Sequence, residues 1–325
     1  MNIKDVLYLP SGRIFLVYSD DGYLIETTEM RDVAVSGKEN YEVRNTEDPH
    51  VIWKHLKPFE EKWLLTVSTQ KGCTHNCQFC DVAELPYKGN LSQKEIEGQI
   101  HTLLENTPYV HKSNKVKIGF ARMGEPAHNL DNVLGAMESL PRISSTHERE
   151  FKWLPCFNTI LPRNIKSLSG SKVLHEVIDF KENIYDGRLH LQLSMNSTDE
   201  EKRRELFGTD VLTTKEIIEE VNKREITDRT VTLNYIVMDG VEVDVEKLKN
   251  FGLNSDKFRV KLIPLNDTEN SKDNSLETYA NYKNYEKLEK LGKQFNDVGV
   301  PTVIDAIAKC EEAGLCCGQL AQIYS

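Results

Sequence analysis

Three cysteines within eight residues are the part of this sequence best suited to chemistry. They are Cys73, Cys77 and Cys80, spaced as C-x3-C-x2-C, with the aromatic Phe79 before the last thiol. Cysteine thiolates hold iron–sulfur clusters, and a compact loop can direct three of them at three irons of one cubane. The fourth iron would then have no protein ligand. The sequence therefore predicts a [4Fe–4S] cluster with one open iron.

Two other interpretations of these thiols stay open at this point. Structural zinc prefers four tetrahedral ligands, so it would require His75 or a distant cysteine. Alternatively, the three residues are structural cysteines clustered by chance. The chain has seven cysteines, and its N-terminus lacks the pattern of a signal peptide, so a disulfide framework is not expected. The other four are Cys156, Cys310, Cys316 and Cys317.

The elements that must position this loop are predicted from an alternation of β-rich and helical patterns. Six β-rich runs cover residues 63–68, 116–120, 151–157, 189–194, 231–238 and 259–264. Helical spacing lies between them at 130–140 and 213–223 and after them at 285–295, and Ser92 with Glu95 forms a capping box that opens a further helix. Six such units predict an α/β fold, a partial (β/α)6 TIM-like barrel. Function in such folds sits at the C-terminal ends of the strands, where the cysteine loop would lie.

The regions flanking this barrel differ from it in pattern. Residues 13–28 contain two β-rich runs on either side of Asp21-Gly22 and predict a β-hairpin. Residues 36–60 and 266–281 are polar and aperiodic, and are expected to be a lead-in and a loop. The expected organisation is an N-terminal β-rich appendage with its lead-in (1–60), the barrel (61–300), and a C-terminal strand with a cysteine-bearing tail (301–325).

Charge and hydropathy exclude some functions. The formal net charge is −10, so a broad cationic surface for nonspecific nucleic-acid binding is not expected. Lys112, Lys115 and Lys117 form a local group of positive charges, but they are few for a surface that binds nucleic-acid phosphates. No apolar run approaches the roughly 20 residues that cross a bilayer. We therefore expect a cytoplasmic protein without a membrane partner.

The cysteine spacing resembles the radical S-adenosylmethionine (SAM) signature, and further segments extend this likeness. In order along the chain, they resemble the RlmN/Cfr-type family, radical SAM methyltransferases that methylate carbon atoms of adenine in RNA. These segments are 67–73 (VSTQKGC), 122–126 (RMGEP) with 129–133 (NLDNV), 193–200, 231–241, 262–266 and 317–321 (CGQLA). The resemblance covers the chain from about residue 63 to the C-terminus.

The resemblance implies a cofactor site. Cys73, Cys77 and Cys80 would hold the cluster, whose open iron binds the amino and carboxylate groups of SAM. The remaining SAM-site residues come from the strand ends. By resemblance, they are Phe79 beside the cluster, Gly124, Glu125 and Pro126 at the SAM amino group, Ser194 and Asn196 at its ribose and carboxylate, Ile263 on its adenine, and Asn266 near the substrate.

The resemblance also implies a reaction that uses two SAM molecules. The first methylates Cys317. The second is cleaved to a 5′-deoxyadenosyl radical, which abstracts hydrogen from that methyl group so that the carbon adds to an sp2 carbon of adenine. A second cysteine then releases the product. In the family that cysteine precedes the first cluster ligand by seven positions, where this chain has Thr66. Cys316 is the predicted substitute, with Cys156 and Cys310 as further options.

The implied partners are adenine-containing RNA or a nucleotide-like substrate, and a flavodoxin-like or similar electron donor. A monomer is expected. The N-terminal region begins with a hairpin and is not expected to form the helical accessory domain of the family. Two alternative functions remain open. One is a radical SAM enzyme of the same fold that abstracts hydrogen directly from a small non-RNA substrate, and the other is a noncatalytic iron–sulfur or zinc module.

Overall fold

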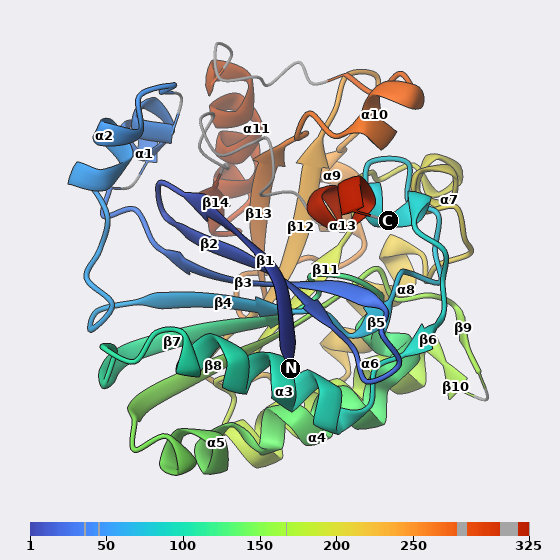
Figure 1. The fold of residues 1–325 in the computed structure, drawn as a ribbon. Coiled ribbons are helices and arrows are strands. Elements are labelled where there is room, and N and C mark those ends of the chain that lie inside the picture. Colours follow the sequence, from blue (N-terminus) through green and yellow to red (C-terminus); the bar gives the residue numbers. More distant parts are fainter. Residues whose placement is uncertain (36, 45, 167, 278–284, 306–317, 325) are drawn as a thin grey trace.

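The computed structural model describes residues 1–35, 37–44, 46–166, 168–277, 285–305 and 318–324. Across these ranges one curved sheet contains ten strands in the order β1-β2-β3-β4-β7-β8-β11-β12-β13-β14 (Figure 1). Its strands are β1 (Asn2–Leu9), β2 (Gly12–Tyr18), β3 (Leu24–Arg31), β4 (Trp63–Val67), β7 (Lys112–Phe120), β8 (Glu150–Thr159), β11 (His190–Ser194), β12 (Val231–Val237), β13 (Phe258–Pro264) and β14 (Thr302–Ile304). Four two-residue strands lie outside it: β5 (Gln70–Lys71), β6 (Gly89–Asn90), β9 (Asn164–Ile165) and β10 (Leu168–Ser169).

The strands β4, β7, β8, β11, β12 and β13 are parallel and form the predicted partial barrel. Each pairs in register with its neighbour, for example Leu65 with Ile118 and Leu193 with Leu233. All six predicted strands are present, and β14 continues the parallel pairing beyond them. The predicted α/β fold class is therefore confirmed.

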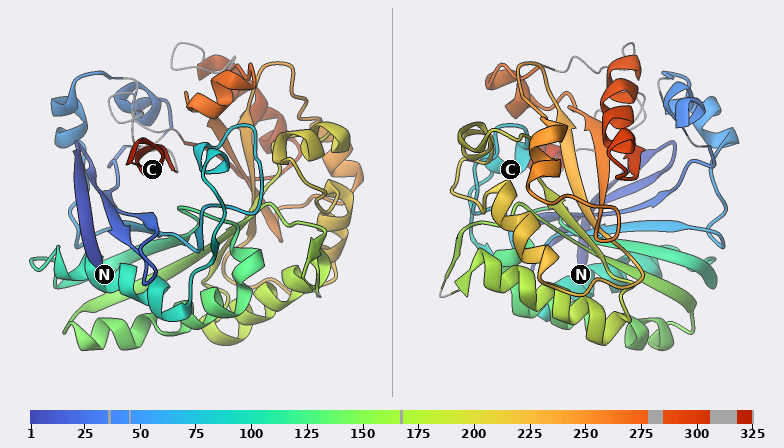
Figure 2. Two further views of the ribbon diagram at one scale, coloured as in Figure 1. Left: turned by 45° about the vertical axis from the view of Figure 1, so that its right-hand side comes forward. Right: turned by 180° about the vertical axis from the view of Figure 1, so that it is seen from behind.

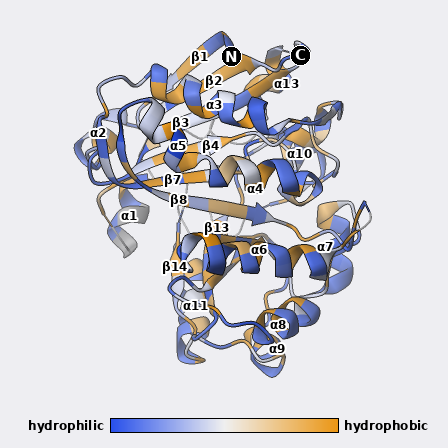
Figure 3. Ribbon diagram, turned by 90° about the horizontal axis from the view of Figure 1, so that it is seen from below, coloured by the Kyte–Doolittle hydropathy of each residue, from blue (hydrophilic) through white to orange (hydrophobic). Residues whose placement is uncertain are grey.

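Helices flank this sheet, most of them on its outer face (Figure 2). They are α1 (Gly37–Arg44), α2 (Pro49–Lys54), α3 (Gln93–Glu105), α4 (Leu130–Glu138), α5 (Leu140–Thr146), α6 (Gly170–Tyr185), α7 (Glu200–Phe207), α8 (Thr214–Asn222), α9 (Val245–Asn250), α10 (Glu269–Asp273), α11 (Tyr285–Asp297) and α13 (Gln319–Tyr324), with 3-10 turns η1 (Asp81–Glu84) and η2 (Pro126–Asn129). Figure 3 shows hydrophilic and hydrophobic residues interleaved along helices such as α6.

The predicted capping box at the start of α3 is confirmed. Ser92 Oγ accepts a hydrogen bond from the Glu95 backbone N–H at 3.2 Å, and Glu95 Oε2 accepts one from the Ser92 N–H at 2.8 Å. Two polar segments contain short helices, so the expected loop at 266–281 is only partly a loop. The polar lead-in at 36–60 contains α1 and α2, and the polar loop at 266–281 contains α10. Both lack the long apolar periodicity that marks a helix from sequence.

The N-terminal strands extend the barrel sheet. The predicted hairpin is confirmed, since β2 and β3 pair antiparallel with Phe15 opposite Thr27. β3 then pairs antiparallel with β4, where Thr28 lies opposite Thr66. Helix α13, near the C-terminus, packs against β3 and η1, as Figure 1 shows. The first strands and the last helix therefore lie beside the loop that follows β4.

The two faces of the parallel sheet differ in polarity. Side chains such as Val116, Ile118 and Phe120 are fully buried in the apolar core under the helices. The alternate residues face the barrel interior, and these are mostly polar: Lys115 and Lys117 on β7, Asn158 on β8, and His190 and Ser194 on β11 line interior cavities. The side-chain period of two along a strand produces this separation. The polar lining leaves the barrel interior available for ligands.

None of the helices described is both long and apolar enough to cross a lipid bilayer.

Candidate active site

The three predicted cluster cysteines lie in one loop beyond the C-terminal end of β4. Cys73, Cys77 and Cys80 form no disulfide bond and line a single cavity of about 150 Å³. The rest of that lining comes from the ends of neighbouring strands. It includes Gly124 and Glu125 after β7, residues 158–160 at the end of β8, and Ser194 at the end of β11. These are the strand ends at which such barrels place their chemistry.

The loop is held by a segment that is distant in sequence. The Asn270 side-chain amide donates to the carbonyls of Cys77 at 2.8 Å and of Cys80 at 3.0 Å. Thr268 Oγ1 donates to the Phe79 carbonyl at 3.2 Å. Because these bonds join the backbone of the cysteine loop to α10, the thiols are positioned by the body of the protein. Sequence reasoning missed Asn270, which lies in a polar stretch without a motif.

The chemistry of the donor set fits an iron–sulfur cluster. Burial raises the pKa of Cys73 to about 11 and that of Cys77 well above its ordinary value, and coordination to iron would supply the positive charge that deprotonates a thiol. No three His, Cys, Asp or Glu side chains in the described ranges converge on a point that would hold a single metal ion. A cubane differs from a single ion because it offers three irons at separate points. His75, the candidate fourth zinc ligand, lies with its Nε2 3.0 Å from Nε2 of His128.

Position 124 requires glycine because Gln70 lies close to the Gly124 backbone. Its φ is +96°, and a Cβ at this position would lie 2.5 Å from Gln70 Cβ. Gln70 in turn accepts a hydrogen bond from the Glu125 N–H through Oε1 at 2.9 Å. The turn after β7 is thereby fixed against the strand that leads into the cysteine loop.

Glu125 places a buried carboxyl group in the cavity wall. Its oxygens accept hydrogen bonds from the backbone N–H groups of Ala127 at 3.0 Å and Ile160 at 3.1 Å. Burial nevertheless raises its pKa to about 7. A cationic group in the cavity would favour the ionised form, so Glu125 is suited to bind an ammonium ion.

The other predicted SAM-site residues fall into two groups. Phe79 and Ser194 line the cysteine cavity, and the Phe79 ring packs edge-on against Phe207 with centroids 5.9 Å apart. Four more lie outside its lining: Pro126 is buried at the start of η2, Asn196 is buried with φ +58°, Ile263 is half-buried on β13, and Asn266 is half-buried after that strand. Asn196 Oδ1 accepts from the Ile236 N–H at 3.1 Å, so it also joins β11 to β12.

A buried ion pair that the sequence did not reveal connects the cavity to the C-terminal segment. Arg122, which lines the cavity, contacts Glu26 Oε2 on β3 at 2.6 Å, and Glu26 is fully buried. The Glu26 carboxylate also accepts from the N–H groups of Gly318 at 3.1 Å and Ala321 at 2.8 Å. Glu26 therefore holds the start of α13 beside the cavity. Its only sequence signal is an acidic residue inside a predicted apolar strand.

The predicted catalytic residues Cys316 and Cys317, and the optional Cys310, lie outside the described residues. Gly318, which follows Cys317 in the chain, is described and has φ +88°. A Cβ on Gly318 would lie 2.7 Å from the backbone nitrogen of Val82, another residue of the cavity wall. Thr66, which replaces the family's second cysteine, and Cys156, an optional substitute for it, are both described. Thr66 shares a 2.6 Å hydrogen bond with Thr28, and Cys156 is buried with its Sγ 3.6 Å from His190 Nδ1.

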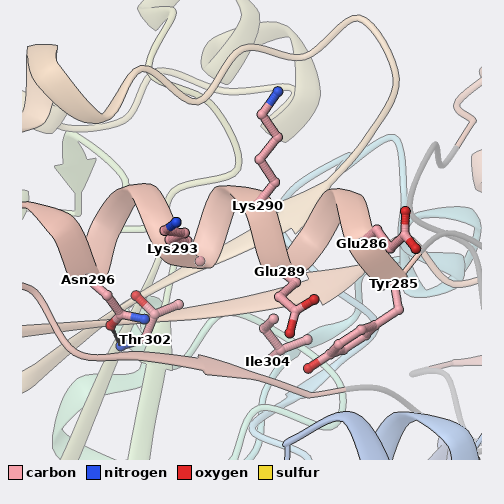
Figure 4. A pocket seen from close by; sticks show the side chains of 9 residues that line it. Tyr285, Glu286, Glu289, Lys290, Lys293, Asn296, Thr302 and Ile304 are labelled. Atoms are coloured by element: carbon pink, nitrogen blue, oxygen red, sulfur yellow. Dashed lines mark hydrogen bonds between the residues drawn. The ribbon is translucent and has the colours of Figure 1, made fainter.

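A roomier cavity, of about 570 Å³, lies away from the thiols between α11 and β14 (Figure 4). The described residues of its wall include Glu289, Lys293 and Thr302, and none of them is a cysteine or histidine. Lys290 points away from β14 in Figure 4. This wall brings together no set of groups suited to catalysis.

Comparison with known proteins supports the motif-based interpretation. A protein described as a probable dual-specificity RNA methyltransferase RlmN from Aquifex aeolicus is 30% identical over 233 residues, which are 69% of this chain and 62% of that protein. A protein of the same description from Bacteroides fragilis is 30% identical over 224 residues, 68% of this chain and 58% of that one. This chain resembles the RlmN-type RNA methyltransferases. It spans about three fifths of the length of these RlmN relatives.

Solved structures confirm the fold of this RlmN-like chain. A radical SAM methyltransferase from Sphaerobacter thermophilus aligns with a TM-score of 0.66 at 17% identity, over 98% of this chain and 80% of its own. A spore photoproduct lyase aligns with a TM-score of 0.51 at 12% identity, over 74% and 75% of the two chains. No protein-family profile matches the chain.

Proposed function

We propose that this protein is a radical SAM enzyme that transfers a methyl-derived carbon to an sp2 carbon of adenine in RNA. The observation that carries the proposal is the gathering of Cys73, Cys77 and Cys80 with Glu125 and Ser194 around one cavity at the C-terminal strand ends. The RlmN-like segments at 67–73, 122–126 and 193–200 lie at the C-terminal ends of β4, β7 and β11. The described residues that line the cavity between α11 and β14 include no thiol.

In this proposal the three cysteines hold a [4Fe–4S] cluster and SAM binds beside it. The bound cluster and SAM would supply the electron and the carbon for a radical reaction. Glu125 would hold the SAM ammonium group, since it is a buried carboxyl in the cavity wall. Gly124 and Pro126 would shape the same turn. Phe79, Ser194, Asn196, Ile263 and Asn266 are proposed as the further contacts to SAM and substrate.

Cys317 is the proposed carrier of the methyl group. Support comes from its neighbour Gly318, whose N–H is bound by Glu26 and which packs closely on Val82 of the cavity wall. Glu26 and Arg122 act as positioning residues, because their ion pair fixes the chain directly after Cys317. Cys316 is proposed as the thiol that releases the product, in place of the cysteine replaced by Thr66.

The proposed partners follow from this chemistry. An adenine-containing RNA is the substrate, and a flavodoxin-like protein or a similar donor supplies the electron. A reducing, cytoplasmic location is proposed because free thiols and an iron–sulfur cluster persist there. We propose that the protein acts as a monomer.

The direct test is an anaerobic reaction of the reconstituted protein with SAM, a reductant and adenine-containing RNA. Mass spectrometry of the digested RNA should show a C-methylated adenosine. Cys317→Ala should abolish this product while retaining the cluster, and Cys156→Ala is the matched thiol control. Unchanged product formation by Cys317→Ala would favour direct hydrogen abstraction and contradict the carrier role. Failure of cluster-loaded protein to cleave SAM would contradict radical chemistry altogether.

A further inference from the structure

A second interior cavity lies at the opposite, N-terminal end of the barrel strands. It measures about 200 Å³, and six of its lining residues are cationic: Lys62, Lys115, Lys117, Arg229, Arg259 and Lys261. Leu154 and His190 of its wall precede Asn158 and Ser194 of the cysteine cavity by four residues on β8 and β11. At about 3.3 Å per strand residue, the two cavities are ~13 Å apart along the strands.

Two of these cations are neutralised within the protein. Lys62 pairs with Asp32 at 2.5 Å, and Lys261 pairs with Asp305 at 2.9 Å. For Lys115, Lys117, Arg229 and Arg259, the described part of the chain provides no carboxylate within ion-pair distance. Asp305 is the only acidic residue in the lining that the structure describes. The cavity wall therefore carries more positive charge than its own carboxylates balance.

The guanidinium groups of Arg259 and Arg229 differ in their hydrogen-bond partners within the protein. Arg259 is oriented by polar neighbours, because its Nε donates to Thr232 Oγ1 at 2.7 Å and its second guanidinium nitrogen lies 3.0 Å from His190 Nε2. Arg229 Nε is buried and has no hydrogen-bond partner among the described groups. A buried donor without a partner costs free energy, and this cost is recovered if a ligand accepts the hydrogen bond.

The electrostatic consequences of this crowding are visible at neighbouring groups. Burial is the largest cause that lowers the pKa of both Lys115 and Lys117, and nearby cations such as Lys62 lower both further. The same two causes hold the pKa of His190 well below its ordinary value. A wholly solvated basic rim would show little of this, because water screens exposed charges. The cations face a partly dehydrated space.

We propose that this cavity binds a phosphate-type oxyanion, either a free polyphosphate or the phosphate group of a nucleotide. Guanidinium groups match the geometry of phosphate oxygens through paired N–H donors, and lysines add positive charge. Arg229 and Arg259 are the proposed donors to the anion, and Lys115 and Lys117 surround it. This site is distinct from the cysteine cavity and does not depend on the function proposed for that cavity.

Inorganic pyrophosphate is the probe for the first experiment. Thermal unfolding and calorimetric titration of the isolated protein are compared in pyrophosphate and in sodium chloride of equal ionic strength. Pyrophosphate should raise the unfolding temperature, because a ligand that binds only the folded state stabilises it. Arg229→Gln should weaken pyrophosphate binding at least tenfold.

Lys117→Met separates ligand binding from a structural role. Without pyrophosphate this variant should unfold at a higher temperature than the wild type, because it removes one of several repelling charges. Pyrophosphate should raise the unfolding temperature of this variant by less than it raises that of the wild type. Lys112→Gln is the matched control, since Lys112 is exposed on the same strand and pairs with Glu150 at 3.4 Å; it should leave both measurements unchanged.

Competition experiments identify the source of the phosphate. Adenosine monophosphate should displace pyrophosphate, whereas adenosine should not. Tighter binding of the nucleotide than of pyrophosphate assigns the site to nucleotides, and the reverse assigns it to free polyphosphate. The proposal fails if pyrophosphate stabilises no more than chloride does, if Arg229→Gln binds it normally, or if Lys117→Met is less stable than the wild type without anion.

Discussion

The three thiols of the cysteine loop line one cavity, but they differ in how their positions are fixed. Cys77 and Cys80 have their carbonyls bound by Asn270, and Cys77 also lies 3.7 Å from the Phe207 carbonyl through its Sγ. Cys77 is thus held from two sides. A cluster bound here would depend on each thiol, since three irons require three ligands.

Replacing Cys77 with alanine should therefore remove the cluster. Anaerobically reconstituted Cys77→Ala should lose nearly all bound iron and sulfide, together with the visible absorbance of the cluster. Cys156→Ala should retain both, because Cys156 lies on β8 beside His190 and outside the cysteine cavity lining. Full iron content in Cys77→Ala would show that the three thiols do not act as one ligand set.

His190 predicts a pH dependence of stability. An N–H of Arg259 points at its Nε2, and burial with nearby cations lowers its pKa well below 6.5. The unfolded chain therefore binds a proton that the folded protein excludes. Stability should fall as the pH drops from about 6.5 toward the folded-state pKa, by up to ~1.4 kcal/mol per pH unit.

The measurement is the free energy of unfolding by urea at several pH values between about 4.5 and 8. His190→Gln should show a shallower decline below pH 6.5 than the wild type. Identical slopes in the two proteins would mean that His190 takes up its proton in the folded state as readily as in the unfolded one.

Helix α13 depends on a carboxylate from the other end of the chain. Glu26 pairs with Arg122 and accepts from two N–H groups at the start of this helix, all within a buried environment. Glu26→Gln should cost about 3–5 kcal/mol of stability, the range for one partner lost from a buried ion pair. Urea unfolding measures this loss.

The double variant Glu26→Gln with Arg122→Met tests the cause. It should be more stable than Glu26→Gln alone, because the buried guanidinium that lost its carboxylate is also removed. Methyl transfer should stay impaired in the double variant although part of the stability recovers, since α13 still lacks its anchor. Recovery of both would show that the ion pair contributes stability without positioning the segment after Cys317.

The turn after β7 has a requirement that only glycine meets. Gly124→Ala would place a Cβ 2.5 Å from Gln70 Cβ at a φ of +96°. We expect backbone strain to lower the free energy of unfolding by about 1–3 kcal/mol. We also expect weaker SAM binding, because the proposed SAM ligand Glu125 follows directly. Gly240→Ala is the control: its φ is +70° but its Cβ would meet no atom within 4 Å. Equal SAM affinity in Gly124→Ala and the wild type would separate this turn from SAM binding.

At the scale of the whole molecule, the sequence predicted features that depend on local patterns better than it predicted long-range contacts. The six parallel strands, the N-terminal hairpin and the capping box at Ser92 are all present, because each depends on neighbouring residues. Asn270 and Glu26 were missed because their partners lie 193 and 292 residues away, respectively. No periodicity or motif marks a contact of that kind.

The net charge of the whole chain gives no information about where its charged side chains gather. A net charge of −10 gave no sign that Lys115, Lys117, Arg229 and Arg259 converge inside the barrel. Lys115 and Lys117 are two positions apart and so face the same side of β7, but Arg259 lies on β13 and Arg229 in the loop before β12. Only the fold brings these cations into one cavity.

The central claim is that the segment held by Glu26 presents a methyl-carrying cysteine to the cysteine cavity. The most direct measurement is peptide mass spectrometry of protein produced and isolated without oxygen. The account predicts a methyl group on Cys317, present in the wild type and absent from Cys77→Ala. An unmodified Cys317, in protein whose cluster is intact and cleaves SAM, would contradict it.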